Sequence, residues 1–225
     1  MRTGKIWHHV WAKHKGKTAR TDVALFEPGI GFPAIKPGGG DVNLIQFGDD
    51  DIRDEKSIRR AAQKALSALS TKPVILVGSM GDTSHTLIEA GEKSADQDIV
   101  LGSALAEGLR TFHMQLAQQV TSPAIFRETR SLLTSLFEEL SDLLKGLYLL
   151  EECSPKARVA LSRYGERACA LLFSHVLRSQ EVASTAFYMR EVFQESEGLR
   201  EEVSALVEKG VIPVLPVSLR ESISS

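Results

Sequence analysis

PVILVG, residues 73–78, gives the clearest indication of the fold of this chain. Four aliphatic residues stand between Pro73 and Gly78, and a short uninterrupted apolar run of this kind is typical of a strand buried on both faces of a sheet. The next residues, SMGDTSHTLIEAGE (79–92), begin with small side chains and take up a helical pattern from about residue 83 to 93. A small-residue loop at the carboxyl end of such a strand is where open parallel sheets bind ligands.

The same alternation of strand and helix continues on both sides of this stretch. Upstream, VNLIQF (42–47) predicts a strand and the apolar spacing after it predicts a helix around 54–70. Downstream, we expect helices at 101–120, 126–150, 155–178 and 197–209, and strands at 182–189 and 211–217. Strands that alternate with helices predict an α/β domain with a mainly parallel sheet and helices on both faces.

The helix predicted at 126–150 carries a wide apolar stripe. Its members are Leu132, Leu133, Leu136, Phe137, Leu140, Leu143, Leu144, Leu147 and Leu150. Such a stripe predicts a helix that packs in the core or against a helix of a partner chain. A homo-oligomer or a complex with a partner chain is therefore expected.

Residues 1–41 differ from the rest of the chain. Residues 1–40 hold seven Lys or Arg against two acidic residues, and they end in PGGG. Because no strand or helix period is sustained there, we expect an irregular basic N-terminal extension, followed by an incomplete domain over 42–225. A basic targeting or docking segment is the functional alternative.

The composition is that of an ordinary globular protein, with 43% hydrophobic residues, 25% charged residues and a net charge of -2. It gives no reason to expect nucleic acid or a membrane as partner. Two cysteines, Cys153 and Cys169, suit a reducing compartment, so a cytoplasmic location is expected and an organelle stays open. The dispersed histidines predict no metal site.

Four segments in order carry a family resemblance: QFGDDDIRDEKSIRRAA (46–62), KPVILVGSMGDTSHTLIEAGE (72–92), LLKGLYLLEECSPKAR (143–158) and LSRYGERACALLFSHVLR (161–178). Together they resemble the aspartate kinase branch of the amino acid kinase family, over about 42–217. The resemblance implies ATP-dependent phosphorylation of the aspartate side-chain carboxylate, the first step towards lysine, threonine and methionine. It also implies ATP and Mg as cofactors, and aspartate and ATP as ligands.

The resemblance assigns roles to residues of this chain. Glu166, with Arg167 beside it, matches the segment that holds the substrate aspartate, and the alternative is a solvated ion pair on a helix. Gly48 matches the first glycine of the phosphate-binding turn, and Ser79 and Gly81 match the second loop near the reacting phosphate.

Other positions depart from the family pattern. Gln46 replaces the family lysine, and Asp49, Asp50 and Asp51 replace a glycine, a threonine and a serine. Phosphoryl transfer relies on positioned cations and N–H donors, so this turn is expected to disfavour a triphosphate. We expect Asp51 or Asp54 to cap the following helix, with magnesium binding as the weaker alternative.

Arg163 stands where the family has a serine, and it is expected to fill the aspartate pocket or to pair with a carboxylate. The chain ends in SLRESISS, where the family continues into the rest of the nucleotide pocket. The sequence therefore predicts an aspartate kinase-like chain that is truncated and inactive alone. Two alternatives stay open: half of a site completed by another chain, and a non-catalytic protein that dimerises through the leucine-rich helix.

Overall fold

The computed structural model describes residues 7–14, 17–24, 43–187 and 198–224. The chain divides into two compact units, Met1–Pro33 and Ala34–Ser225. The strands are β1 (Trp7–His14), β2 (Lys17–Ala24), β3 (Leu44–Phe47), β4 (Val74–Val77), β5 (Ser184–Ala186) and β6 (Ile212–Pro216). The α-helices are α1 (Glu55–Ser67), α2 (Thr83–Ala95), α3 (Ile99–Val120), α4 (Pro123–Leu150), α5 (Pro155–Arg178), α6 (Leu199–Glu208) and α7 (Arg220–Ser224), with short 3-10 helices at Asp49–Ile52, Leu69–Thr71 and Val217–Leu219.

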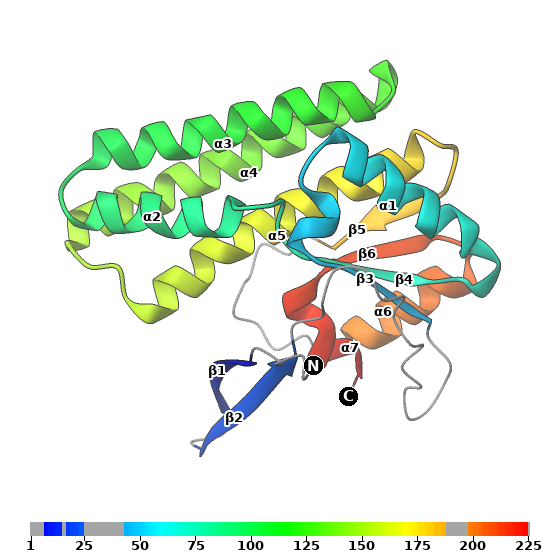
Figure 1. The fold of residues 1–225 in the computed structure, drawn as a ribbon, viewed down its shortest axis with the longest axis horizontal. Helices are drawn as coiled ribbons and strands as arrows, with labels where there is room; N and C mark the ends of the chain where they lie inside the picture. The colour runs from blue at the N-terminus through cyan, green and yellow to red at the C-terminus, as the bar shows by residue number, and fades with distance from the viewer. Residues whose placement is uncertain (1–6, 15–16, 25–42, 188–197, 225) are drawn as a thin grey trace, which may run out of the picture. The chain divides into compact units, whose positions relative to one another are not determined.

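The larger unit is built on a four-stranded sheet in the order β3-β4-β6-β5 (Figure 1). Every neighbouring pair in this sheet is parallel, with Leu44 opposite Val74, Ile75 opposite Val214 and Ser184 opposite Ile212. The predicted α/β class and its mainly parallel sheet are confirmed. The carboxyl ends of β3, β4 and β6 consequently lie along one edge of the sheet.

β4, the apolar run from Val74 to Val77, is buried on both faces of the sheet, as its composition predicts. All four residues of β4 are buried, and they alternate between the two faces of the sheet. Ile75 and Val77 belong to the larger apolar core with residues of α1–α5, whereas Val74 and Leu76 belong to a smaller core with residues of α6 and α7. Because both faces are covered, a strand at this position has to be apolar throughout.

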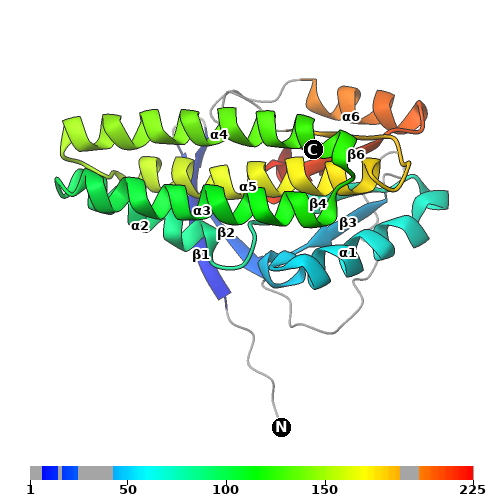
Figure 2. The same ribbon diagram turned by 90° about the horizontal axis from the view of Figure 1, so that it is seen from above.

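The larger core is formed mostly by long helices. α2, α3, α4 and α5 pack alongside one another, and both views show them as neighbouring rods (Figures 1 and 2). Most of the leucine stripe on α4 lies inside this core: Leu133, Leu136, Phe137, Leu140, Leu144 and Leu147 are buried. Of the two readings of the stripe, packing within the chain is the one that the structure shows.

The smaller unit contains a regular element where irregular chain was expected. β1 and β2 pair antiparallel from Trp7 opposite Ala24 to His14 opposite Lys17, with residues 15–16 between them. Strand-forming residues, among them Trp11, Thr21 and Val23, explain why these segments pair despite their many charges. The expectation of an extension without strands is therefore wrong for these two segments.

α1, α2 and α5 begin within one residue of the predicted positions, whereas α3 and α4 begin two and three residues earlier than predicted, α6 begins two residues later, and α7 was not predicted. Asp54 caps α1 by accepting the backbone N–H of Ser57 at 2.7 Å, and Ser154 caps α5 by accepting the N–H of Ala157 at 3.2 Å. Across the described ranges, no helix has both the length and the apolar character needed to span a membrane.

Candidate functional site

The candidate site lies at the carboxyl edge of the sheet, the position where open parallel sheets bind ligands. Three segments leave the strands here: the turn at Gly48 after β3, the loop Gly78–Gly81 after β4, and Val217–Leu219 after β6. The middle of α5 reaches the same edge, because Glu166 contacts Ser218 and the charge of Asp49 acts on Glu166. The fold thus brings together Gln46, Gly48, Ser79, Gly81 and Glu166, which the sequence had singled out separately.

Asp51, the last of the three consecutive aspartates, and Asp54 have clear local partners. Asp51 accepts the backbone N–H of Gly48 at 3.0 Å and thereby closes the turn after β3. Asp54, which follows the run, caps α1 as described above. Hydrogen bonds to Ser57 are the main cause of the lowered pKa of Asp54. Of the two candidates for capping the following helix, Asp54 has that role, whereas Asp51 holds the turn before it.

Asp49 links the first turn to the second loop. Its carbonyl accepts the N–H of Gly81 at 3.1 Å, and the backbone N–H of Ser79 favours the charged form of its carboxylate. The carboxylate lies against Gly78 so closely that a Cβ there would be 2.1 Å from Asp49 Oδ1. Burial of the carboxylate raises the pKa of Asp49; the bond from Ser79 opposes that rise, and the charge of Asp50 adds to it.

Glu166 faces the same edge from α5. Its Oε2 accepts the backbone N–H of Ser218 at 3.2 Å, across 52 positions of sequence. Burial raises the pKa of Glu166, and the nearby charge of Asp49 raises it further. The bonds from Ser218 and the charge of Arg163 act in the opposite direction. Arg163 therefore lies within electrostatic reach of a carboxylate, as one of its two expected roles requires.

Gln46 has a partner that the sequence did not suggest. Arg220, the first residue of α7, donates from Nη1 to Gln46 Oε1 at 3.1 Å. The two residues are 174 positions apart, so this contact joins the first strand of the sheet to the last described helix. A guanidinium group thus lies at the end of β3, beside the position where the family has its lysine.

α5 packs tightly against the loop after β4 at Gly165. A Cβ at this position would be 2.6 Å from Ser79 Oγ and 3.1 Å from Thr83 Cγ2. Contacts this short leave no room for any side chain larger than that of glycine. Gly165 therefore lets Glu166, its neighbour on α5, come near the second loop.

Arg167 lies elsewhere. Its side chain is buried and points towards α4, where it donates to Glu139 Oε2 at 2.9 Å. Its guanidinium also lies 4.8 Å from the ring centre of Tyr164. The solvated pair of Glu166 and Arg167 that was the alternative reading is not present, since each residue has a different partner. Arg167 has a structural contact and does not join the cluster at the sheet edge.

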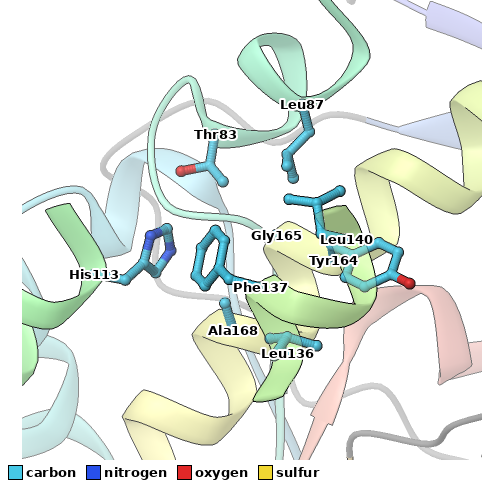
Figure 3. Close-up of a pocket in the computed structure, with 9 residues that line it drawn as sticks. All are labelled: Thr83, Leu87, His113, Leu136, Phe137, Leu140, Tyr164, Gly165 and Ala168. Atoms are coloured by element: carbon cyan, nitrogen blue, oxygen red, sulfur yellow. The ribbon is translucent and has the colours of Figure 1, made fainter. Parts of the chain in front are cut away.

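A narrow apolar pocket lies between α2, α3, α4 and α5 (Figure 3). Its lining includes Thr83, Phe137, Gly165 and the fully buried His113. His113 Nδ1 lies 2.8 Å from the carbonyl of Leu109, so this nitrogen carries the proton and donates it, while Nε2 has no partner among the described residues. Burial lowers the pKa of His113 to about 4, so the ring is neutral.

Sequence reasoning missed Ser218 and Arg220, which hold Glu166 and Gln46. No motif marks them, and they reach Glu166 and Gln46 only because the segment after β6 lies at the sheet edge. Within the part of the chain that the structure describes, no group of three or more His, Cys, Asp or Glu side chains converges as a metal site would require.

Comparisons with known proteins find similarity to aspartokinases over part of the chain. No family model matches the chain. Aspartokinase 2, chloroplastic, of Arabidopsis thaliana is 26% identical over 136 residues, which is 60% of this chain and 24% of that protein. Lysine-sensitive aspartokinase 3 of Escherichia coli is 24% identical over 189 residues, which is 78% of this chain and 38% of that protein. The chain thus spans less than two fifths of the relatives it matches.

Solved structures show the same likeness in the fold. Escherichia coli aspartokinase III in complex with aspartate and ADP superposes with a TM-score of 0.63 and 18% identity, over 78% of this chain and 40% of that one. Its complex with lysine and aspartate superposes with a TM-score of 0.59 and 18% identity, over 76% of this chain and 40% of that one. Taken with the parallel sheet and the edge cluster, these likenesses show that the chain contains an aspartokinase-like partial region with an amino acid kinase-like α/β fold.

Proposed function

We propose that this chain is an aspartokinase-like protein that does not phosphorylate aspartate on its own. The observation that carries the proposal is the position of Asp49. Its carboxylate lies against Gly78, next to the backbone N–H of Ser79, a donor in the loop that the family resemblance places near the reacting phosphate. An anion of the chain itself therefore stands beside a donor that a phosphate group would need.

The charges at the edge support the same conclusion. Two unit negative charges about 5 Å apart repel by roughly 3 kcal/mol at an effective dielectric near 20. The Asp49 carboxylate would oppose a triphosphate by an energy of this size. Gln46 adds no positive charge in compensation, because its amide is neutral; the guanidinium of Arg220, which donates to Gln46 Oε1, offsets only part of this repulsion. Binding of ATP, and of the Mg that accompanies it, is expected to be weak.

The aspartate position is also engaged. Glu166, which the resemblance assigns to substrate binding, accepts the backbone N–H of Ser218. A ligand that used this carboxylate would compete with that bond. Both halves of the transfer reaction, the nucleotide and the acceptor, therefore meet groups that already have partners within the chain.

The experiment is a direct assay of aspartyl phosphate. Purified chain is incubated with MgATP, L-aspartate and hydroxylamine, and aspartyl hydroxamate is compared with a heat-killed control. Calorimetric titration with MgADP is run in parallel. We expect no hydroxamate above the control and no measurable heat of binding. Aspartate-dependent hydroxamate from the unmodified chain would overturn the proposal.

A second candidate is a non-catalytic interaction protein that self-associates through the end of α4. The leucine stripe is packed inside the chain, but Leu149 and Leu150 are 78% and 74% exposed, and Val100 on α3 is 79% exposed. Gln97 donates to the carbonyl of Tyr148 at 2.8 Å, which holds the start of α3 beside the end of α4. Exposed apolar side chains at one end of a helix bundle favour association.

Light scattering at micromolar concentration tests this candidate. We expect a mass above that of the monomer, and a lower mass when Leu149→Lys and Leu150→Lys are combined. A monomeric mass for the unmodified chain would contradict association through this end of the bundle.

A further inference from the structure

The segment Val217–Ser224, which we call the clasp, makes two long-range polar contacts at the sheet edge. From its 3-10 turn, Ser218 donates its N–H to Glu166 on α5 at 3.2 Å. From α7, Arg220 donates to Gln46 on β3 at 3.1 Å. These contacts attach one short segment to two different elements of the candidate site.

The clasp also makes a small apolar contact with the smaller core. Ile223 is buried and belongs to the smaller core, with Leu199 and Val203 of α6, and Leu219 packs partly buried against the same core. The other residues of 217–222 are half-buried or exposed. A segment with few buried apolar side chains opens at a lower free energy than the core it rests on.

The polar contacts and the apolar contact have different consequences. Ile223 fixes where α7 rests, on the α6 side of the sheet. The bonds of Ser218 and Arg220 fix how the segment meets the carboxyl edge, because they engage side chains that point there from β3 and α5. Loss of the polar contacts alone should release the edge while α7 keeps its apolar anchor.

We propose that the clasp closes the carboxyl edge of the sheet, and that it has to move away before any ligand can reach Glu166 and Gln46. The clasp is a conformational device of the fold, and its action does not depend on whether the chain transfers phosphate. Opening of the clasp can therefore be measured independently of any formation of aspartyl phosphate.

Position 46 offers a test in both directions. Gln46→Glu places a carboxylate opposite Arg220 and should strengthen the contact, whereas Gln46→Lys places a like charge there and should break it. Amide hydrogen exchange of peptides covering 217–224 and 46–52 reports the opening. We expect exchange to slow in Gln46→Glu and to accelerate about tenfold in Gln46→Lys, the effect of losing one charge-assisted hydrogen bond.

Carboxyl labelling with a water-soluble carbodiimide and glycine ethyl ester provides the second measurement. Labelling of Glu166 should be low in the unmodified chain and in Gln46→Glu, and higher in Gln46→Lys. Lys145→Gln is the matched control, because it breaks the exposed pair with Asp142 on α4 and should change neither measurement. If Gln46→Lys does not fold, as judged by circular dichroism, Arg220→Gln removes the same charge from the other side.

Two results would overturn the proposal. One is equal exchange of 217–224 in all variants, which would show that the contact with Gln46 does not hold the segment. The other is faster exchange of 217–224 with unchanged labelling of Glu166, which would show that the segment opens without uncovering the site.

Discussion

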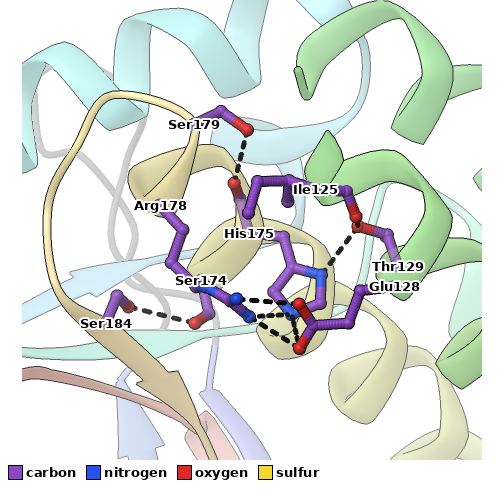
Figure 4. A network of polar contacts seen from close by, with 8 residues as sticks. All are labelled: Ile125, Glu128, Thr129, Ser174, His175, Arg178, Ser179 and Ser184. Atoms are coloured by element: carbon purple, nitrogen blue, oxygen red, sulfur yellow. Dashed lines mark hydrogen bonds and ion pairs between the residues drawn. The ribbon is translucent and has the colours of Figure 1, made fainter. Parts of the chain in front are cut away.

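Thr129 on α4 and His175 on α5 are both buried, and Thr129 Oγ1 lies 2.7 Å from His175 Nδ1 (Figure 4). The hydroxyl also lies 2.8 Å from the carbonyl of Ile125, to which it has to donate its hydrogen. The ring therefore donates from Nδ1 to Thr129, and Nε2 is the bare nitrogen that accepts from Arg178 Nη1 at 3.0 Å. This pattern requires a neutral imidazole.

The electrostatics of His175 agree with that protonation state. Burial and, to a smaller extent, the charge of Arg178 lower its pKa to about 4, against the opposing charge of Glu128. Arg178 is itself fixed by Glu128, with two bonds of 2.8 and 2.7 Å. The network joins α4 to α5 through groups that all have partners.

Thr129→Val is the first prediction. Valine keeps the shape of threonine but leaves the Nδ1–H of His175 without an acceptor inside the core. The free energy of unfolding should fall by about 1–3 kcal/mol, measured by urea denaturation. Thr134→Val, at a half-buried position of the same helix, is the control and should change it by less than about 0.5 kcal/mol. Equal effects of the two substitutions would contradict the hydrogen-bond assignment.

The second prediction concerns acid. His113 and His175 each have a folded-state pKa of about 4, below the ordinary 6.5. As the pH falls below 6.5 the unfolded chain takes up protons that the folded chain refuses, so stability falls between pH 6.5 and 4. Each histidine contributes up to about 3 kcal/mol to this fall.

The carboxyls of Asp49 and Glu166 act with the opposite sign, because their raised pKa values make the folded chain bind protons first. A comparison of variants isolates the histidine effect. His113→Phe should unfold in urea with a weaker loss of stability from pH 6.5 to 4.5 than the unmodified chain. An unchanged dependence on pH would show that His113 is protonated in the folded state.

The sequence predicted the α/β elements of the larger unit closely because their physical signals are local. β4 is uniformly apolar since both its faces are covered, and α5 begins at Pro155 because Ser154 caps the helix and proline is favoured at its first position. The edge contacts were beyond such reasoning. Gln46 and Arg220 are 174 positions apart, and neither residue type announces a partner. The sequence analysis did not predict β1 and β2, because the many charged residues there interrupt the alternation of apolar and polar residues that indicates a strand.

The third prediction is that the larger unit folds without the smaller one. Its two apolar cores are built from residues from Leu44 onward. A chain that starts at Ala34 should therefore unfold cooperatively within a few degrees of the full chain's midpoint. Circular dichroism followed during heating measures this. A midpoint lower by many degrees would show that residues 1–33 contribute to the stability of the larger unit.

The last prediction tests the contact between Asp49 and Gly78 on which the proposed function rests. A Cβ at position 78 would be 2.1 Å from Asp49 Oδ1 and 3.3 Å from the backbone nitrogen of Asp49. Gly78→Ala should therefore displace the Asp49 carboxylate and lower the free energy of unfolding by about 1–3 kcal/mol. Asp49→Ala alone should have a smaller effect, because Asp49 is exposed and its removal leaves no steric conflict.

The double variant Gly78→Ala with Asp49→Ala shows how much of the destabilisation by Gly78→Ala comes from the steric conflict with the Asp49 carboxylate. With the carboxylate gone, the new methyl group of Gly78→Ala meets only the backbone nitrogen at 3.3 Å, so most of its cost should disappear. The two substitutions should thus be non-additive by about 1 kcal/mol or more in urea denaturation. Simple additivity would mean that the carboxylate does not lie between the two loops. The donor of Ser79 would then be open to a phosphate, and the main reason for expecting no kinase activity would be removed.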